Sequence, residues 1–578
     1  MQFDFKELET ESGAEFTNIE TQSHDVVIFN PFFDINAKSR PLPPGAYELT
    51  PDSKSLLTES CRVLKRGGLF FVYGLPQELP LIGEFLDDFH DEDSRMVFKY
   101  WIALDIDNRP RQEALKASHL GLLMYLKTGL NASSPFSLNT KDVKTPHRFC
   151  AACGKNVKDW GGKKHLMNPN GTAVSDVWRD FKRVQIVNHL LPKKVESRII
   201  DLTKSRGAKY LKLKSRRSFI QQAGRIAESA SARPSLEFSE LQFDKAYQGD
   251  CISFLESVSH IYPNGVFDMV FADPPYNLGK NYNVYADSLA QKHYIEWCNS
   301  WLLGMAKTLK PGGALFVLNL PKWCIHHATF LQRHLEFRNW IVWDALSDPR
   351  GKIMPAHYAL LYYTKPGGLP TFNYRGMKAA LSPDYVSAPD SPKYCLRGQC
   401  VKERKKKGDN EKAELTDIWS DIHRIKHKRD RDAHPCQLPE KLMERLILLS
   451  TKPGGVVFDP FSGAGTTAIA STKLGRHFVV TDLDSKYVRI TEEKVKAMQA
   501  NADLFGNYIV PRTTVRRDKQ PASKKDVETH LQGLARKLGR TPSESDIASN
   551  APGMLAKIDL LYSSRGEAIK RSKVALVN

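Results

Sequence analysis

Residues 266–279 read VFDMVFADPPYNLG and decide how the central part of this chain folds. The run from Phe267 to Ala272 is almost wholly apolar, which predicts a buried strand. The two prolines that follow Asp273 predict a fixed turn, because each locks its own φ and neither offers a backbone N–H. We therefore expect function at the carboxyl end of this strand.

The turn combines a carboxylate on Asp273, a fixed carbonyl on Pro274, the ring of Pro275 and the aromatic face of Tyr276. An exocyclic amine such as N6 of adenine is a poor nucleophile, because its lone pair is delocalised into the ring. Asp273 and the Pro274 carbonyl can accept the amine hydrogens and localise that pair, while Tyr276 can stack on a flipped-out base. The amine would then attack a sulfonium methyl group directly. The alternative is an ordinary Pro-Pro turn capped by Asp273.

A second segment, GGVVFDPFSGAGTTAIAS at residues 454–471, predicts a strand, a turn of small residues and the start of a helix. Gly463 and Gly465 allow a ligand to approach the backbone closely. The third glycine of a dinucleotide fingerprint is missing, which argues against a pyrophosphate cofactor. Asp482 follows the turn by about 20 residues, where an acid that binds a ribose is expected. A nucleoside-type ligand fits this pattern.

With these two motifs the chain resembles the beta class of DNA amino-methyltransferases, which methylate N6 of adenine or N4 of cytosine. In that family the DPPY segment precedes the FxGxG segment, as Asp273 precedes Phe461 here. Further similar segments lie at residues 247–258, 309–319 and 433–447. The last departs from the family at Leu438, where many members carry Lys. The resemblance covers roughly residues 246–500.

The resemblance implies an α/β fold of the Rossmann-like, S-adenosylmethionine-dependent methyltransferase type. Its sheet would have seven mostly parallel strands, with helices on both faces and ligands beyond the carboxyl ends of the strands. The implied cofactor is S-adenosylmethionine. The implied cofactor-binding residues are Asp459, Phe461, Gly463 and Gly465 near the methionine part, Asp482 on the ribose and Asp250 and Cys251 near the adenine, with Thr466, His434 and Gln437 completing the set.

The first residue of the catalytic motif bears on which base is modified. Asp273 favours adenine N6, since the cytosine-N4 members of the family more often begin this motif with serine. N4-cytosine methylation and RNA methylation stay open as alternatives. A non-enzymatic nucleic-acid scaffold would require both motifs to be vestigial, although neither shows degradation.

The first 200 residues repeat the catalytic half in degraded form. HDVVIFNPFFD at 24–34 echoes FDMVFADPPYN, and four further segments echo the second half in the same order. Asn30 and Phe33 take the places of Asp273 and Tyr276, and a neutral amide is a poorer polariser of an amine than a carboxylate. No counterpart of DPFSGAG follows residue 200. We predict a silent half fused to a catalytic half, which favours a monomer with an internal pseudo-dimer; chance similarity is the alternative.

Each half also carries a cysteine pair at the same place in the repeat, Cys150 with Cys153 and Cys395 with Cys400. Four thiolates make a complete ligand set for structural zinc. If the halves pack about a pseudo-twofold axis, the two pairs can meet in one site. Alternatively, His165 completes a smaller knuckle with the first pair, or all four cysteines are free surface thiols.

Composition points to a polyanionic partner. The 578 residues include 84 Lys and Arg against 65 Asp and Glu, a formal charge of +19. The resemblance makes double-stranded DNA the expected partner, and a cognate restriction enzyme is a further candidate. The polar amino end shows no signal peptide, and no apolar run is long enough to span a membrane, so we expect no membrane association and a cytoplasmic setting of bacterial or phage type.

These patterns predict five segments and a recognition region. They are a degenerate domain at 1–205, a linker at 206–245, a catalytic domain at 246–512 with a target-recognition region at 366–416, a basic linker at 513–526 and a helical domain at 527–578. The last resembles the small helical DNA-binding repeats attached to homing endonucleases; an interaction module without DNA contact is the alternative. Thr541 is predicted to cap a helix there, with Glu544 at capping-box spacing.

Overall fold

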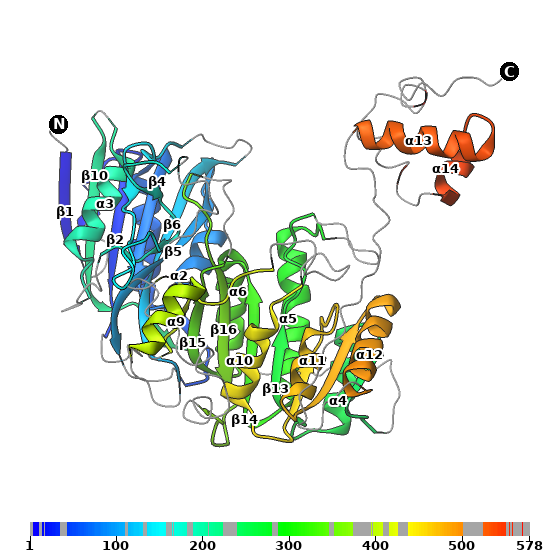
Figure 1. Ribbon diagram of the computed structural model, residues 1–578. Helices are drawn as coiled ribbons and strands as arrows, with labels where there is room; N and C mark the ends of the chain where they lie inside the picture. The colour runs from blue at the N-terminus through cyan, green and yellow to red at the C-terminus, as the bar shows by residue number, and fades with distance from the viewer. Residues whose placement is uncertain are drawn as a thin grey trace. The chain divides into compact units, whose positions relative to one another are not determined.

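Two β-sheets of related strand order form the larger part of the protein (Figure 1). The computed structural model describes residues 4–10, 14–16, 18–34, 43–109, 114–130, 136–157, 165, 167–181, 189–205, 207–223, 240–279, 287–345, 352–373, 395, 397–407, 415–425, 437–500, 524–550, 554, 558 and 569. Both sheets belong to one unit, residues 1–430 with 436–511, and the C-terminal helices belong to a second unit, residues 431–435 with 512–578.

The first sheet runs in the order β1-β10-β2-β4-β6-β5-β9. Its strands are β1 (Asp4–Thr10), β2 (His24–Phe32), β4 (Leu64–Gly74), β5 (Ser94–Arg109), β6 (Ala117–Gly129), β9 (Val177–Trp178) and β10 (Lys209–Ser218). It is accompanied by η1 (Ala14–Phe16), α1 (Pro51–Val63), α2 (Leu79–Asp88) and α3 (Lys193–Thr203). Two small antiparallel pairs join β3 (Tyr47–Leu49) to β11 (Ile220–Gln222) and β7 (Lys144–Thr145) to β8 (Thr172–Ala173).

The second sheet runs in the order β12-β19-β18-β13-β14-β16-β15-β17. Its strands are β12 (Lys245–Gln248), β13 (Phe267–Ala272), β14 (Leu309–Asn319), β15 (Glu336–Trp343), β16 (Tyr358–Thr364), β17 (Ile418–Trp419), β18 (Val456–Asp459) and β19 (His477–Asp482). The helices of this half are α4 (Cys251–Ile261), α5 (Gln291–Thr308), α6 (Pro321–Leu331), α9 (Gly398–Lys406), α10 (Glu440–Ser450), α11 (Thr466–Lys473) and α12 (Ser485–Ala500). The prediction of seven strands was one too few, because β17 is a two-residue strand formed only by its pairing with β15.

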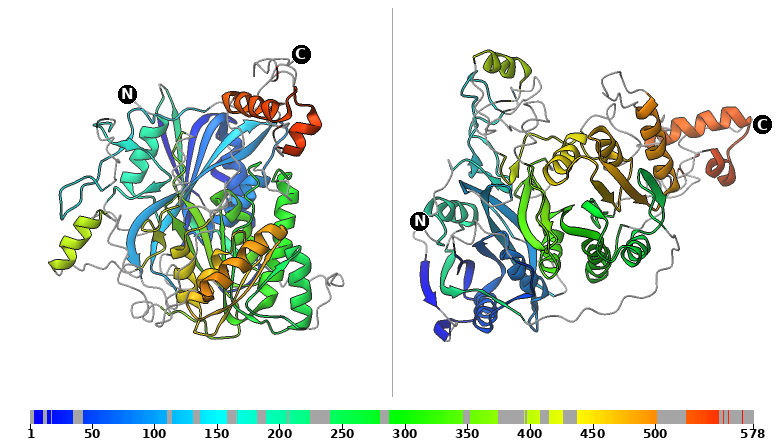
Figure 2. Two further views of the ribbon diagram at one scale, coloured as in Figure 1. Left: turned by 45° about the vertical axis from the view of Figure 1, so that its right-hand side comes forward. Right: turned by 90° about the horizontal axis from the view of Figure 1, so that it is seen from below.

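Helices cover both faces of the second sheet, as the predicted fold class requires. Val270 of β13 packs in the core that includes α4, α5 and α6. Its neighbour Met269 packs in a separate core that includes α10. Because successive side chains of a strand point to opposite faces, these helix groups lie on opposite sides of the sheet. Figure 2, right, shows the yellow and orange helices on one side and the green helices on the other.

The two sheets share a common arrangement of strands. Five consecutive positions, β2-β4-β6-β5-β9 and β13-β14-β16-β15-β17, match in order. The pairs also match in direction: parallel, then twice antiparallel, then parallel. β10 and β18 take the same place beside β2 and β13.

Backbone hydrogen bonds cross between the two halves in reciprocal fashion. The N–H of Asp417 in the second half donates to the Lys116 carbonyl of the first at 3.1 Å. The N–H of Asp176 in the first half donates to the Met354 carbonyl of the second at 3.2 Å. Asp176 and Asp417 hold the same place in the two halves of the repeat, and so do Lys116 and Met354. Each half therefore donates one equivalent hydrogen bond to the other.

Apolar packing also joins the halves. Trp101 of β5 stacks on Trp340 of β15, with ring centroids 3.9 Å apart and planes within 5°. Helix α2 packs on α6, and a Cβ built on Gly83 would lie 2.9 Å from a methyl of Ile325. A single core therefore includes side chains of both halves.

Residues 206–245, predicted as a linker, contain part of the first sheet. β10 lies between β1 and β2, and Tyr210, Leu211 and Leu213 on it are buried. The linker prediction was wrong because lysines and arginines interrupt the apolar residues of this strand, so that the segment resembles a solvated basic stretch.

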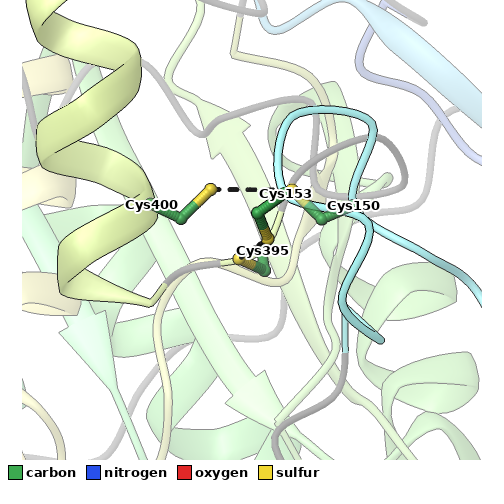
Figure 3. Close-up of side chains that lie close together, drawn as sticks. All are labelled: Cys150, Cys153, Cys395 and Cys400. Atoms are coloured by element: carbon green, nitrogen blue, oxygen red, sulfur yellow. Dashed lines mark hydrogen bonds between the residues drawn. The ribbon is translucent and has the colours of Figure 1, made fainter.

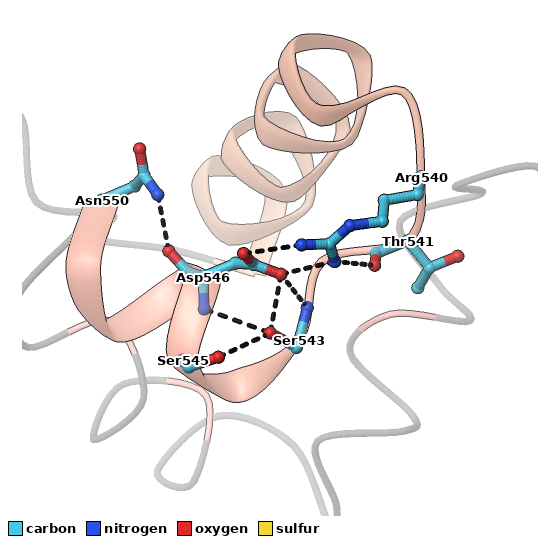
Figure 4. Close-up of polar contacts among 6 residues, drawn as sticks. All are labelled: Arg540, Thr541, Ser543, Ser545, Asp546 and Asn550. Carbon is cyan, nitrogen blue, oxygen red and sulfur yellow. Dashed lines mark hydrogen bonds and ion pairs between the residues drawn. The ribbon is translucent and has the colours of Figure 1, made fainter.

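The C-terminal unit contains α13 (Lys524–Leu538) and α14 (Glu544–Asn550) around a small apolar core. The predicted cap at Thr541 was wrong, because Ser543 precedes the helix directly. The Ser543 hydroxyl accepts from the N–H of Asp546 at 3.2 Å, and the Asp546 carboxylate accepts from the N–H of Ser543 at 2.7 Å (Figure 4). This reciprocal pair is a capping box, with Asp in the usual place of Glu or Gln. Arg540 donates to the same carboxylate at 2.6 Å.

No helix within the described ranges is both long enough and apolar enough to cross a bilayer.

Candidate functional site

Four acidic residues lie at or just after the carboxyl ends of neighbouring strands in the second sheet. β13 pairs with β18, β18 with β19, and β19 with β12, all in parallel. Asp273 follows β13, Asp459 and Asp482 end β18 and β19, and Asp250 follows β12. Since the carboxyl ends of parallel strands meet at one edge, both sequence motifs lie at that edge.

Hydrogen bonds from aromatic side chains fix the turn after β13. The hydroxyl of Tyr276 donates to Oδ1 of Asp273 at 2.5 Å. The hydroxyl of Tyr294 on α5 donates to the Pro275 carbonyl at 2.6 Å, and the indole N–H of Trp323 on α6 donates to the Tyr276 carbonyl at 2.8 Å. Tyr276 is 8% exposed. Because its hydroxyl donates to Asp273, Tyr276 orients the Asp273 carboxylate, a role that the sequence did not reveal.

Asp287 is a further buried acid that holds this turn. Its carboxylate accepts from the backbone N–H groups of Asn277 at 2.6 Å and Leu278 at 3.0 Å. Asn277 has a φ of 54°, a left-handed conformation that these bonds help to hold. Sequence reasoning missed Asp287, because no motif connects it to the turn it stabilises.

The glycines after β18 have the backbone freedom that the sequence predicted. Gly463 and Gly465 have φ values of 48° and 82°. A Cβ on Gly465 would lie 2.5 Å from the hydroxyl of Thr491, so the turn packs tightly against α12. The N–H of Gly463 donates to the Asp482 carboxylate at 3.0 Å, which connects the turn to the next strand. Phe461, in the same turn, packs edge-on against Trp301 with centroids 5.3 Å apart.

Two carboxyl groups in this region have raised pKa values, one of them buried and the other partly buried. Asp459 accepts from the N–H of Phe461 at 2.9 Å and from the hydroxyl of Thr467. Burial nevertheless raises the pKa of Asp459 from 3.8 to about 7. Burial also raises the pKa of Asp482. Acids with raised pKa values beside a glycine turn are candidates for a functional site.

We expect Asp459→Asn to reduce the pH dependence of stability. The native protein retains a proton on Asp459 that the unfolded chain releases, so the wild type should lose stability as pH rises from about 4 to about 7, with no further loss above that. Each pKa unit corresponds to about 1.4 kcal/mol. Across this window the free energy of unfolding of the wild type should therefore fall by on the order of 3–4 kcal/mol relative to that of the variant. Thermal denaturation of both proteins from about pH 4 to about pH 8 measures this, and a melting temperature that depends on pH in the same way in both proteins would contradict it.

The remaining predicted cofactor residues lie near the same edge with different surroundings. The Asp250 carboxylate caps α4 by accepting from the N–H of Ser253 at 3.0 Å, and the next residue, Cys251, is buried. Thr466 is the buried first residue of α11, and Gln437 lies just before α10. His434 lies outside the described residues.

The corresponding edge of the first sheet differs in chemistry. Asn30 is fully buried, and its side-chain oxygen accepts from the N–H of Leu191 at 3.1 Å. Phe33 is buried against Tyr73, with ring centroids 5.7 Å apart. Residues 209–222, which form β10 and continue into β11, contain no glycine. An amide and a phenyl ring thus stand where the second half has a carboxylate and a phenol.

The four cysteines predicted as metal ligands come together. Their sulfur atoms all lie within 4.8 Å of one another, although the pairs come from different halves of the chain. His165 is exposed and lies outside this group, so the smaller knuckle proposed for it does not form.

Comparison with known proteins gives one family match and several matches to related proteins. Residues 267–493, from β13 into α12, match a family model described as DNA methylase. Type II methyltransferase M.BamHI of Bacillus amyloliquefaciens is 33% identical over 301 residues, which cover 50% of this chain and 67% of that protein. DNA adenine methyltransferase YhdJ of Escherichia coli strain K12 is 25% identical over 258 residues, 42% of this chain and 79% of that protein. The solved structure of an M1.HpyAVI–SAM complex aligns at 18% identity with a TM-score of 0.31, over 43% of this chain and 97% of the other.

Proposed function

The chain belongs to the DNA amino-methyltransferases of the N6/N4 family, and on that premise we propose that it transfers a methyl group from S-adenosylmethionine to an exocyclic amine of a base in double-stranded DNA. The observation that carries this proposal is the position of the Asp273 turn beside the glycine turn, at the carboxyl ends of the paired strands β13 and β18. In this proposal the Asp273 turn binds the base and the glycine turn binds the cofactor.

The two acids and the glycines form the cofactor site in this proposal. Asp482 accepts the ribose hydroxyls, and Asp459, with Phe461 and the two glycines, surrounds the methionine part. S-adenosylmethionine supplies an electrophilic methyl group on a sulfonium centre. Asp250, Cys251, Thr466, His434 and Gln437 complete the proposed set of contacts.

The base is held by the turn after β13. Asp273 and the Pro274 carbonyl accept the two amine hydrogens, which directs the nitrogen lone pair towards the methyl group. The Tyr276 hydroxyl keeps the Asp273 carboxylate in place, and Pro275 is fixed by its bond from Tyr294. In the transfer, the nitrogen–methyl bond would form as the sulfur–methyl bond breaks, and the methylated amine would release one proton to solvent. Contacts in the pocket offset a cost of a few kcal/mol for flipping the base.

We propose adenine N6 as the acceptor, with cytosine N4 as the alternative. Asp273 as the first residue of the motif supports adenine, and the name of YhdJ describes an adenine enzyme. Incubation of the purified protein with unmodified DNA and S-adenosylmethionine, followed by mass spectrometry of the nucleosides, separates the two. N6-methyladenine is the expected product. N4-methylcytosine would show that cytosine is the acceptor base. Methyl transfer to RNA but not to DNA would contradict the proposed DNA substrate.

We further propose that the first half is a silent methyltransferase-like copy. The common strand order and the reciprocal contacts between halves support this, as does the asparagine at the position of the catalytic acid. The chain would then act as a monomer whose halves form a pseudo-dimer, and the formal charge of +19 and the C-terminal helices would serve DNA binding. A cognate restriction enzyme remains a proposed partner.

Asn30→Ala is expected to leave methyl transfer within about twofold of the wild type, although it removes a buried hydrogen bond and costs about 1–3 kcal/mol of stability. Initial rates of methyl transfer to DNA, measured well below the unfolding temperature, test this. A rate loss of about a hundredfold or more in a folded variant would mean that the first half takes part in the chemistry.

A further inference from the structure

The four cysteines at the junction of the halves have the arrangement of a closed metal site. Sγ of Cys150 lies 3.7 Å from Sγ of Cys400, and Sγ of Cys153 lies 3.7 Å from Sγ of Cys395 (Figure 3). Sulfur atoms about 2.3 Å from one zinc ion lie about 3.8 Å apart at the corners of a tetrahedron. A disulfide bond would be about 2.05 Å long, far shorter than either distance.

The first pair lies on a turn that points both thiols to one side. The N–H of Gly154 donates to the Cys150 carbonyl at 2.8 Å, and the N–H of Cys150 donates to the Lys155 carbonyl at 2.8 Å. Gly154 has a φ of 64°, which closes the turn immediately after Cys153. The Cys-x-x-Cys spacing therefore places two sulfurs on the same side of one short turn.

The second pair approaches from the other half. Cys400 lies in the first turn of α9, where the helix dipole favours a negatively charged thiolate, and Cys395 precedes that helix. Arg397 donates to the Asn156 carbonyl beside the first pair at 2.6 Å, and buried Arg404 donates to the Cys395 carbonyl at 3.2 Å. These cations offset the charge of four thiolates around one divalent ion.

We propose that Cys150, Cys153, Cys395 and Cys400 bind one structural zinc ion that fastens the silent half to the catalytic half. Three of the four side chains are buried and all four ligand positions are filled by sulfur, which is typical of a structural rather than a catalytic site. The ion adds a metal-mediated link to the contacts that already join the two halves, such as the stacking of Trp101 on Trp340. This inference concerns how the chain is held together, and it does not depend on which base is methylated.

Metal analysis of the full-length protein tests the site. Inductively coupled plasma mass spectrometry should find about one zinc per chain in the wild type and in Cys61→Ala, a matched variant of a buried cysteine on α1, and under about 0.2 in Cys150→Ser and Cys395→Ser. On folded wild-type protein, a mercurial reagent should release the zinc as about four thiols react, so the result does not depend on the variants folding.

A zinc ion that joins the two halves should stabilise the folded protein, whereas a metal bound at the surface would not. Removal of zinc by a chelator should lower the melting temperature by roughly 5 °C or more, and added zinc should restore it. Zinc that persists in both serine variants, iron in place of zinc, wild-type protein without metal, or a disulfide between Cys150 and Cys400 in peptide mass spectra would each overturn the proposal. An unchanged melting temperature after zinc removal would contradict this stabilising role.

Discussion

Replacement of Asp273 by alanine should abolish methyl transfer while S-adenosylmethionine still binds. The variant loses the carboxylate that Tyr276 orients and that we propose to accept an amine hydrogen. Loss of a comparable catalytic group lowers kcat by about 10²–10⁴-fold. We expect a decrease near the upper end of this range, because the amine of the base is a poor nucleophile and the variant lacks the charged group that would activate it. The dissociation constant for S-adenosylmethionine, measured by titration calorimetry, should change by less than about threefold, because Asp273 follows β13 whereas most of the proposed cofactor residues lie at or after the ends of β12, β18 and β19.

Asp268→Ala is the matched control, since Asp268 lies on the same strand at its opposite end. Its carboxylate accepts from Lys310 at 2.7 Å and from the N–H of Val456 at 2.8 Å. Its loss should therefore lower stability and leave the rate per folded molecule unchanged. Equal loss of cofactor binding and of transfer in Asp273→Ala would count against the assigned role.

Replacement of Asp482 by alanine should weaken S-adenosylmethionine binding by about a hundredfold or more. The side chain organises the glycine turn through its bond from the N–H of Gly463 and is proposed to accept the ribose hydroxyls. A hydrogen bond to a charged group contributes about 1.5–3 kcal/mol, so the loss of two corresponds to roughly two to four orders of magnitude. At saturating cofactor the transfer rate should recover in part, because Asp273 is untouched.

Asp244→Asn is the matched control for this variant. Asp244 interacts with His477 at the start of the same strand, with Nδ1 and Oδ2 2.8 Å apart, and so lies at the opposite edge of the sheet. It should bind the cofactor as the wild type does. A wild-type dissociation constant in Asp482→Ala would place the cofactor elsewhere.

The proposed site could be predicted from the sequence because its motifs are local. Apolar strands followed by Pro-Pro or glycine turns place Asp273 and Asp482 at strand ends, and parallel pairing then brings them to one edge. The contacts that hold the site come from distant segments and leave no local pattern. Asp287, Tyr294 and Trp323 act on the turn through bonds that only the folded chain reveals.

The errors of prediction have the same origin. β17 is a strand only because β15 lies beside it, and β10 is hidden in sequence by its basic residues. Ser543 rather than Thr541 caps α14, since the helix begins at Glu544 and cap position follows the boundary. The cysteines were the opposite case. The repeat itself indicated that two pairs far apart in sequence could meet, and the structure brings them within 4.8 Å.

Modification-sensitive single-molecule sequencing detects the proposed reaction and its dependence on Asp273. DNA from a methylase-deficient host that expresses the wild-type chain would be compared with DNA from the same host expressing Asp273→Ala. We expect methylated adenine within one repeated sequence context in the first sample and none in the second. Absence of any modified base with the wild type, or the same modification with Asp273→Ala, would contradict it.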